Sequence, residues 1–291
     1  RMCATLEPLL GFDLRTQLYP TEEAEAAPGF RANFDTPRVT QPAIFVTELA
    51  LGRTLLELGV RPAAMGGHSI GEFVAATLCG VISEADALGL IAARARLSEE
   101  APAGAMLMCP IDAARARAIV DAAPPGKLWL AVANAPKRQV IAGEPTAVGE
   151  VEATLKEEGV KARLLPINRA YHTPLMVSVQ VALQAQLETV ELRPPAVPLA
   201  CNGTGGWMKP EVAVDPAYWA AHVATCVRWS DNMDVLASKA PAQVIEVGAG
   251  SSLAPLLAEC TAAGADELET VSTLRHPRTP FAAGAADAEA F

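Results

Sequence analysis

The sequence predicts an α/β protein with a mainly parallel sheet and a small inserted subdomain of ferredoxin-like type. Strand-like and helix-like segments alternate along most of the chain, which is typical of an open, mainly parallel sheet. A serine flanked by glycines stands between one such strand and helix, at residues 67–71. The block from about 103 to 167 stands apart, because its segments follow the order strand-helix-strand-strand-helix-strand.

The first third of the chain carries three helix patterns and one short strand. Residues 42–58 predict a helix, because apolar residues recur there mostly at three- and four-residue spacing. The segment "AAMGGHS" predicts a short strand ending in a glycine turn, and residues 70–79 predict a second helix. A third helix follows at 83–97, with Ser83 as its cap and two acids in its first turn, where the helix dipole favours them.

The small subdomain is predicted to span residues 103–167. Its strands are "AMLMCP", "LWLAVAN" and "RQVIAG", and its helices cover 112–123 and 146–159. This order predicts the ferredoxin-like unit, in which two helices pack on one sheet.

The large subdomain is predicted to combine residues 1–102 with residues 168–275. Its second part holds a helical stretch at 174–190 and the strand-like runs "VPLACN", "AQVIEVGAG" and "LETVST". Residues 276–291 are mostly small and show no clear period, which is typical of a linker or tail.

Composition excludes several classes of protein. The 291 residues carry a net charge of −10, whereas a nucleic-acid binder would be expected to carry a basic face. No apolar run approaches the roughly 20 residues that span a bilayer, and no signal-like leader opens the sequence. Six cysteines lie far apart without a C-x-x-C pair, which argues against zinc and for reduced thiols. We therefore expect a soluble, cytoplasmic enzyme without membrane or nucleic-acid partners and without a metal.

The segment "GGHSIGEF" (66–73) contains the pattern G-x-S-x-G around Ser69. Between a strand and a helix, this pattern is the nucleophile elbow of an α/β-hydrolase-like core. The Ile70 amide, at the start of the helix, is then a natural half of an oxyanion hole. Two readings stay open from the pattern alone: a glycine-rich turn with a cap serine, or a nucleophile that serves either hydrolysis or acyl transfer.

A nucleophilic serine needs a base, and the chain has four histidines: His68, His172, His222 and His276. His172 follows a strand-like run and opens a helix, where α/β enzymes display catalytic groups. It is the best candidate for the base, with His222 in reserve. A purely structural histidine remains the alternative.

Seven collinear segments resemble the malonyl-CoA:acyl carrier protein transacylases, and in particular the acyltransferase domains of modular polyketide synthases. They are "TQPAIF" (40–45), "GHSIGEF" (67–73), "ALGLIAARARL" (87–97), "AVANAPKRQVIAG" (131–143), "RAYHTPLM" (169–176), "YWAAHVATCVRW" (218–229) and "VIEVGAG" (244–250). Seven blocks in order are far more specific than one G-x-S-x-G.

The resemblance implies a role for each matching position. Ser69 would attack the thioester of malonyl-CoA, and His172 would take its proton and return it to the leaving thiolate. The main-chain carbonyl of His222 would orient His172, so no aspartate is needed. Arg94 would pair with the free carboxylate of malonate, because a guanidinium matches a carboxylate through two parallel hydrogen bonds. The alternative for Arg94 is an exposed helix arginine.

The same resemblance implies the partners and the pocket. The acceptor would be the phosphopantetheine thiol of an acyl carrier protein, with neighbouring synthase domains and no permanently bound cofactor. Gln41 and His68 would belong to the substrate pocket; a helix-cap role for Gln41 is the alternative. The tetrad "RAYH" would bear on extender choice through Arg169 and Tyr171, because the Tyr171 ring would fill the space of an α-methyl group. Malonyl is therefore expected over methylmalonyl.

One departure concerns the start of the chain. The family opens with a strand and a "GQG" loop, whereas this sequence begins "RMCATLEPLLGFDL" and resembles the helical region after that loop. The resemblance thus implies that this strand and loop are missing from the 291 residues. The alternatives to a synthase acyltransferase are a free-standing fatty-acid malonyl transacylase and a serine hydrolase or degenerate binding domain on the same scaffold.

Overall fold

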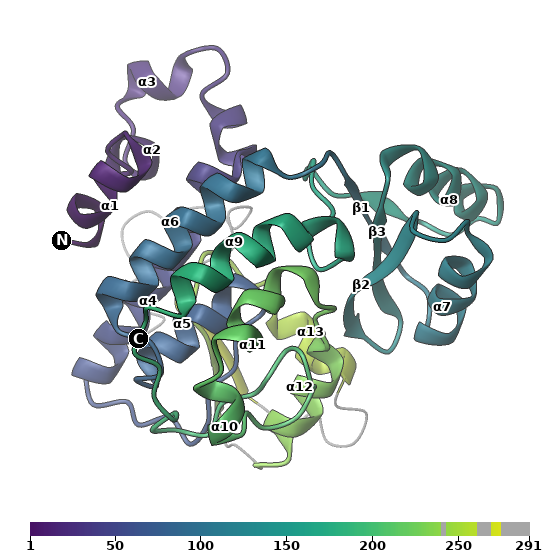
Figure 1. Ribbon diagram of the computed structural model, residues 1–291. Coiled ribbons are helices and arrows are strands. Elements are labelled where there is room, and N and C mark those ends of the chain that lie inside the picture. The colour runs from purple at the N-terminus through teal and green to yellow at the C-terminus, as the bar shows by residue number, and fades with distance from the viewer. Residues whose placement is uncertain (240–242, 261–268, 275–291) are drawn as a thin grey trace.

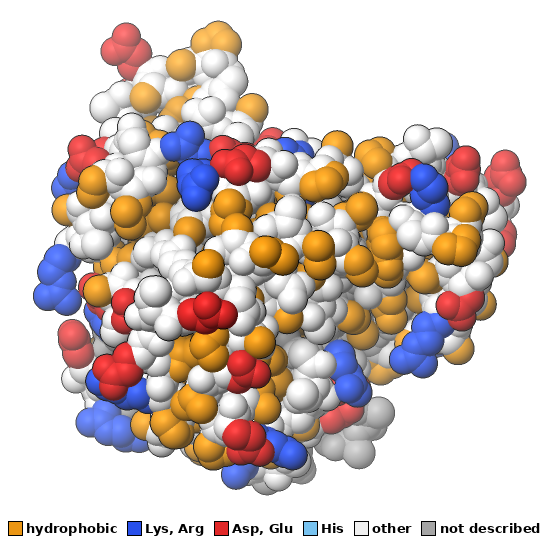
Figure 2. All heavy atoms as spheres, in the orientation of Figure 1, with side chains coloured by type: hydrophobic (Ala, Val, Ile, Leu, Met, Phe, Trp, Pro, Cys, Tyr) orange, Lys and Arg blue, Asp and Glu red, His pale blue; other side chains and the backbone are white. Residues whose placement is uncertain are grey.

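The protein has a mixed helix-and-sheet architecture made of a large, mostly helical body and a small lobe built on a sheet (Figure 1). The computed structural model describes residues 1–239, 243–260 and 269–274. The tail predicted at 276–291 lies outside these residues. On the face shown in Figure 2, acidic and basic side chains are interspersed with apolar ones.

The large body is organised around helices α4 (Pro37–Glu57), α5 (Ile70–Leu78) and α6 (Glu84–Glu100), with α1 (Met2–Leu10) and α9 (Val177–Leu187) packed against α6. Their apolar faces meet in one core that includes Phe45, Phe73, Ile91 and Trp219. Burying each such side chain contributes about 1.5–3 kcal/mol. Helix α4 begins earlier than the sequence predicted, since Pro37 occupies the first turn, where its missing N–H removes no intrahelical hydrogen bond.

Short elements complete the large body. Those before the site are α2 (Arg15–Leu18), α3 (Glu22–Ala26) and η1 (Arg31–Asp35). Those after the small lobe are η2 (Pro174–Met176), α10 (Pro210–Ala213), α11 (Pro216–Ala221), η3 (His222–Ala224), α12 (Trp229–Ala237) and α13 (Ala254–Cys260). Among the described residues, no helix is both long and apolar enough to cross a bilayer.

The small lobe contains β1 (Ala105–Cys109), α7 (Ala113–Ala122), β2 (Leu128–Ala135), β3 (Arg138–Gly143), α8 (Pro145–Glu157) and β4 (Arg163–Leu164). Its four strands form an antiparallel sheet in the order β2-β3-β1-β4. One face of the sheet packs on α7 and α8 through Leu107, Ile141 and Leu155. The other face packs on α12 and α13, and paired backbone hydrogen bonds join Ala131 and Ala133 to Val227.

Parallel pairing in the large body is shorter than the sequence predicted. The strands β5 (Gln243–Glu246) and β6 (Glu269–Ser272) pair in parallel, and a single parallel bridge joins Met65 to Leu199. Both bridged segments end quickly, because the elbow glycines follow Met65 and a tight turn closed by Gly205 follows residue 201. An extended parallel sheet is therefore not seen within the described part of this body. A cavity of about 510 Å³ separates the Met65 segment from β5.

Candidate active site

Ser69 stands on the turn between the Met65 segment and α5, in a backbone conformation that is rare for any residue except glycine. Its φ and ψ are 53° and −114°. Such geometry costs of order 1–3 kcal/mol and persists only where the surroundings enforce it. The turn therefore has the strained form of the nucleophile elbow that the sequence predicted.

Gly67 is required by this turn in a way that Gly71 is not. A Cβ added at residue 67 would lie 1.9 Å from the carbonyl oxygen of Gly71, whereas one at residue 71 would meet its nearest atom, in Glu48, at 3.6 Å. The first glycine thus prevents a clash between two backbone segments. The second only occupies a helical position.

We expect Gly67→Ala to lower the free energy of unfolding by about 3 kcal/mol or to prevent folding, because backbone atoms would have to move. Gly71→Ala, the matched control, should be neutral or slightly stabilising, since alanine favours a helix by up to about 1 kcal/mol over glycine. Urea denaturation of both variants measures the difference. Equal losses would show that the turn does not need its first glycine for steric reasons.

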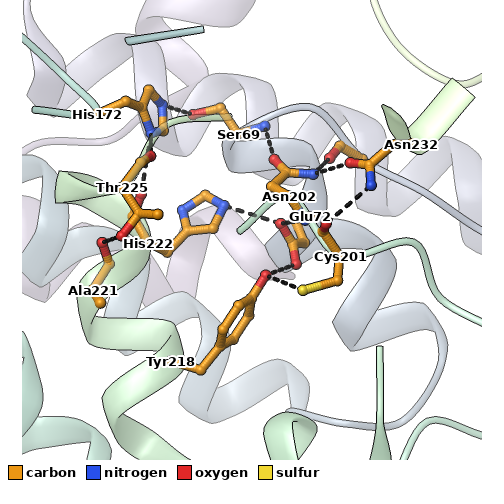
Figure 3. Close-up of polar contacts among 11 residues, drawn as sticks. Ser69, Glu72, His172, Cys201, Asn202, Tyr218, Ala221, His222, Thr225 and Asn232 are labelled. Carbon is orange, nitrogen blue, oxygen red and sulfur yellow. Dashed lines mark hydrogen bonds and ion pairs between the residues drawn. The ribbon is translucent and has the colours of Figure 1, made fainter. Parts of the chain in front are cut away.

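His172 lies directly against the serine (Figure 3). Its Nε2 is 2.8 Å from Ser69 Oγ, and its Nδ1 is 3.1 Å from the carbonyl oxygens of both His222 and Thr225. The His172 backbone has a φ of 63°, and its N–H donates to the carbonyl of Val223 at 2.8 Å. With Nδ1–H donating to the carbonyls, Nε2 is free to accept the serine proton.

The charge state of His172 suits a base. Burial holds the pKa of His172 well below its ordinary value, and the nearby His222, Arg94 and His68 lower it further, while the hydrogen bond to the His222 carbonyl acts in the opposite direction. The imidazole is therefore neutral at pH 7 and can accept a proton.

The Ile70 amide is the expected oxyanion donor. It belongs to the first turn of α5, where N–H groups have no intrahelical acceptor. The neighbouring Ser69 amide is already used, because it donates to Asn202 Oδ1 at 2.9 Å. Of these two amides, only the Ile70 N–H can donate to a substrate oxygen without the loss of a described hydrogen bond.

Arg94, on α6, is a buried cation. Its side chain is 2% exposed, and its Nη1 donates to Gln41 Oε1 at 2.6 Å. Its Nε has no hydrogen-bond partner, and no described carboxylate forms an ion pair with it. Burial lowers its pKa to about 10, so it stays charged at neutral pH. A buried charge without a counterion is costly, and an anionic group at this position would lower that cost.

Gln41 and Tyr171 hold the guanidinium in place. Gln41 Nε2 donates to the Tyr171 hydroxyl at 3.1 Å, and the guanidinium carbon of Arg94 lies 5.6 Å from the centre of the Tyr171 ring. Arg94 lies near enough to His172 to lower its pKa, so this cluster and the Ser69–His172 pair belong to one site. The expected positions of Gln41, Arg94 and Tyr171 thus converge.

The hydrogen bonds of two other predicted pocket residues go to groups outside the Ser69–His172 pair. Arg169 donates to the backbone carbonyls of Ser98 and Glu99, at 2.8 and 2.6 Å, so it caps the C-terminal end of α6. His68 Nε2 lies 2.8 Å from Asn134 Oδ1, and its ring packs edge-on to Trp229 at 5.2 Å. Neither has a described hydrogen bond to Ser69, His172 or Arg94. The described hydrogen bonds of Arg169 thus make it a cap of α6, and its role in the pocket stays a prediction.

The structure also adds polar residues that sequence reasoning missed: Glu72, Asn202, Tyr218, Thr225 and Asn232. Glu72, Asn202, Tyr218 and Asn232 form a hydrogen-bonded cluster behind the pair, whereas Thr225 contacts His172 through its carbonyl (Figure 3). One signal was available, since Glu72 is a lone acid in the apolar run "IGEFVAATL". Within the described residues, no group of three or more His, Cys, Asp and Glu side chains could hold a metal ion.

Comparison with known proteins identifies relatives over nearly the whole chain. The profile of the Acyl transferase domain family matches residues 4–286. Polyketide synthase GfsB of Streptomyces halstedii is 33% identical over 264 residues, which are 89% of this chain and 4% of that protein. Spectinabilin polyketide synthase system protein NorB of Streptomyces orinoci is 34% identical over 258 residues, which are 88% of this chain and 12% of that protein. The chain thus spans a small part of these curated relatives.

Solved structures agree with this relationship. The acyl transferase domain of SpnD, in complex with 2-(pent-4-yn-1-yl)malonyl, superposes with a TM-score of 0.87 at 34% identity, covering all of this chain and 66% of that one. Malonyl-CoA:acyl carrier protein transacylase (FabD) of Xanthomonas oryzae gives a TM-score of 0.82 at 26% identity, over 94% of this chain and 85% of that one.

Proposed function

Because the chain belongs to the acyl transferase domain family, we propose that it loads a malonyl unit from malonyl-CoA onto Ser69 and passes it to the phosphopantetheine thiol of an acyl carrier protein in polyketide biosynthesis. The observation that carries this proposal is Arg94, a buried and unpaired cation in the site of a Ser–His pair. A simple esterase has no use for such a group.

The first half-reaction follows from the geometry. His172 Nε2 takes the proton of Ser69 Oγ as Oγ attacks the thioester carbonyl, and the Ile70 amide stabilises the resulting oxyanion. The C–S bond then breaks, and the coenzyme A thiolate leaves with the proton from His172. The carbonyls of His222 and Thr225 hold the imidazolium that forms between these steps, since both accept from Nδ1–H.

The second half-reaction runs in reverse with a different thiol. His172 removes the proton of the carrier thiol, the sulfur attacks the malonyl-serine ester, and Ser69 recovers its proton. The Arg94 guanidinium keeps the far carboxylate in place between the halves, so the ester waits in one orientation. The cycle is ping-pong and requires no bound cofactor.

Malonyl is the extender unit that the pocket favours. Tyr171 packs its ring beneath the Arg94 guanidinium and is tied to Gln41, so its ring cannot easily move away from the acyl group. An α-methyl group would have to share this space. Discrimination by one methyl is worth about 1–3 kcal/mol.

The proposed subdomains and partners rest on the resemblance to polyketide synthase acyltransferase domains. We assign residues 1–102 and 168–275 to an α/β-hydrolase-like large subdomain, and the four-stranded lobe at 103–167 to a ferredoxin-like small subdomain. The carrier protein and the neighbouring domains of a cytoplasmic synthase are the proposed partners. The alternative is a free-standing malonyl-CoA:acyl carrier protein transacylase, which would use the same chemistry; one solved neighbour is a transacylase of that name.

Intact-protein mass spectrometry after mixing with malonyl-, methylmalonyl- or acetyl-CoA tests the proposal. We expect a malonyl adduct that is absent in Ser69→Ala, and methylmalonyl loading slower by about tenfold or more, as one methyl group predicts. Rapid release of free malonate without an adduct would indicate a hydrolase. Faster loading of acetyl than of malonyl would remove the role proposed for Arg94.

A further inference from the structure

A buried carboxylate, Glu72, lies behind the Ser69–His172 pair. It is on α5, three residues after the nucleophile, and is fully buried. We propose that Glu72 is a positioning residue for acyl transfer, because a single carboxylate oxygen binds both the residue that supports Ser69 and the residue that supports His172. This inference rests on the proposed function.

The oxygen in question is Oε2. It accepts from the backbone N–H of Asn202 at 3.1 Å, and it lies 3.1 Å from His222 Nε2. The other oxygen, Oε1, accepts from the Tyr218 hydroxyl. The two residues that meet at Oε2 are 130 and 150 positions away in the sequence, so the carboxylate joins segments that no local structure connects.

On the nucleophile side, Asn202 clamps the strained elbow. Its Oδ1 accepts from the Ser69 amide at 2.9 Å, and its Nδ2 donates to the Gly67 carbonyl at 2.8 Å. One side chain therefore binds two backbone groups of the turn, both directly before the Cα of Ser69. Asn232 supports the same amide, since its Oδ1 accepts from Asn202 Nδ2 at 2.9 Å.

On the base side, His222 connects Glu72 to His172. The His222 carbonyl accepts from His172 Nδ1 at 3.1 Å, and the two imidazole rings pack edge-on with centres 5.7 Å apart. With its Nε2 fixed by Glu72, the His222 ring cannot rotate, and the carbonyl of the same residue is held toward His172. Figure 3 shows this path from Glu72 through His222 to His172 and, on the other side, through Asn202 to Ser69.

The charges in this cluster are compatible with such a role. Burial raises the pKa of Glu72 to about 8, while the bonds from Tyr218 and Asn202 act against that rise. Burial likewise lowers the pKa of His222 to about 3. His222 is therefore neutral at pH 7, and with the proton of its ring on Nε2 it donates a hydrogen bond to Oε2.

A positioning role for Glu72 affects the rate of acyl transfer and not the binding of malonyl-CoA. Arg94 and Gln41 lie on α6 and α4, and no described hydrogen bond links them to Glu72. Loss of Glu72 should therefore lower kcat and leave KM for malonyl-CoA unchanged. A residue that only stabilised the fold would lower the melting temperature without changing the rate per folded molecule.

The test compares three variants of the 291-residue protein. Glu72→Leu removes both hydrogen-bonding oxygens, whereas Glu72→Gln keeps an oxygen that can accept from Asn202 and His222. Thr77→Val is the matched control, since Thr77 is buried on the same helix and its hydroxyl donates to the Phe73 carbonyl at 2.8 Å, outside the cluster. The readouts are kcat and KM for malonyl loading, the melting temperature, and the rate of Ser69 labelling by a fluorophosphonate, all per folded molecule.

We expect Glu72→Leu to lower kcat and the labelling rate by about 10²-fold, as misplaced reacting groups do. Glu72→Gln should stay within about fivefold of the wild type, the worth of one neutral hydrogen bond. The inference is overturned if kcat and the labelling rate of Glu72→Leu lie within about threefold of those of Thr77→Val. It is also overturned if Glu72→Gln loses about 10²-fold, because glutamine keeps the hydrogen-bonding oxygen and positioning by that oxygen would then not explain the effect.

Two further measurements distinguish a folding defect from a positioning defect, and a failure of this inference from a failure of the proposed function. If Glu72→Leu does not fold, Asn202→Ala takes its place. We expect Asn202→Ala to lower the rate of Ser69 labelling by about tenfold or more, and a labelling rate equal to that of Thr77→Val is the contrary result. Fluorophosphonate labelling needs only an activated serine. If the wild type is labelled but takes no malonyl group, the proposed function fails while the comparison still decides the role of Glu72.

Discussion

Replacing His172 with alanine is expected to lower the rate of Ser69 acylation by up to about 10⁴-fold, the upper range for general base catalysis. The geometry supports the upper end, because Nε2 lies 2.8 Å from Ser69 Oγ and no other described side chain makes a hydrogen bond to that hydroxyl. Burst-phase release of coenzyme A measures the acylation rate. Ser69→Ala, which can form no ester, gives the background of the assay.

The pH profile gives an independent check on the same residue. Because burial lowers the pKa of His172 well below 6.5, the neutral base persists as the pH falls, and the acid limb of the acylation rate should lie below pH 6.5. The unfolded chain binds a proton at this residue near pH 6.5, whereas the folded chain does not, so this residue starts to lower the stability near pH 6.5, at a higher pH than the acid limb of the activity. An acid limb at or above pH 6.5 would assign the titration to another group, and His172→Ala should lose this limb altogether.

The local parts of the site could be predicted from the sequence because they depend on neighbouring residues. Gly67 and Ser69 belong to one tight turn, and the clash that a side chain at residue 67 would cause is with Gly71, four positions away. Arg94 was reached through family resemblance, since without it the residue would have been interpreted as an exposed helix arginine. The resemblance did not indicate that Gln41, 53 positions earlier, would accept a hydrogen bond from the guanidinium.

The remaining parts depend on contacts between distant segments, which no local pattern encodes. Asn202 reaches the elbow, and Glu72 reaches His222, across more than a hundred residues. In sequence Glu72 is a single acid in an apolar run, and Asn202 is the first residue of a glycine-rich turn. Arg169 was assigned to the pocket through the "RAYH" tetrad of the family resemblance, and its side chain runs to the end of α6. Adjacency in sequence does not determine the direction of a long side chain.

Arg94→Met is expected to separate two kinds of donor. Loading from malonyl-CoA should fall by about 10²–10³-fold, because truncating one partner of a buried charge pair typically costs roughly 2–5 kcal/mol. Loading from acetyl-CoA, which has no carboxylate to pair, should change by less than about threefold on the same scale. Arg94→Lys keeps the charge but loses the planar fork, so its malonyl rate should lie between those of the wild type and Arg94→Met.

The melting temperature of Arg94→Met distinguishes a substrate-binding role of Arg94 from a structural one. In the free protein Arg94 is a buried cation whose Nε has no partner and which forms no ion pair with a described carboxylate, so it opposes folding until an anion arrives. Methionine at this position fills similar volume without a charge, and Arg94→Met should therefore melt no lower than the wild type while it loses malonyl transfer. A residue kept for the fold would show the reverse, with a lower melting temperature and equal losses for both donors. A stable variant that has lost only the dicarboxylic donor would show that the arginine is retained for its substrate.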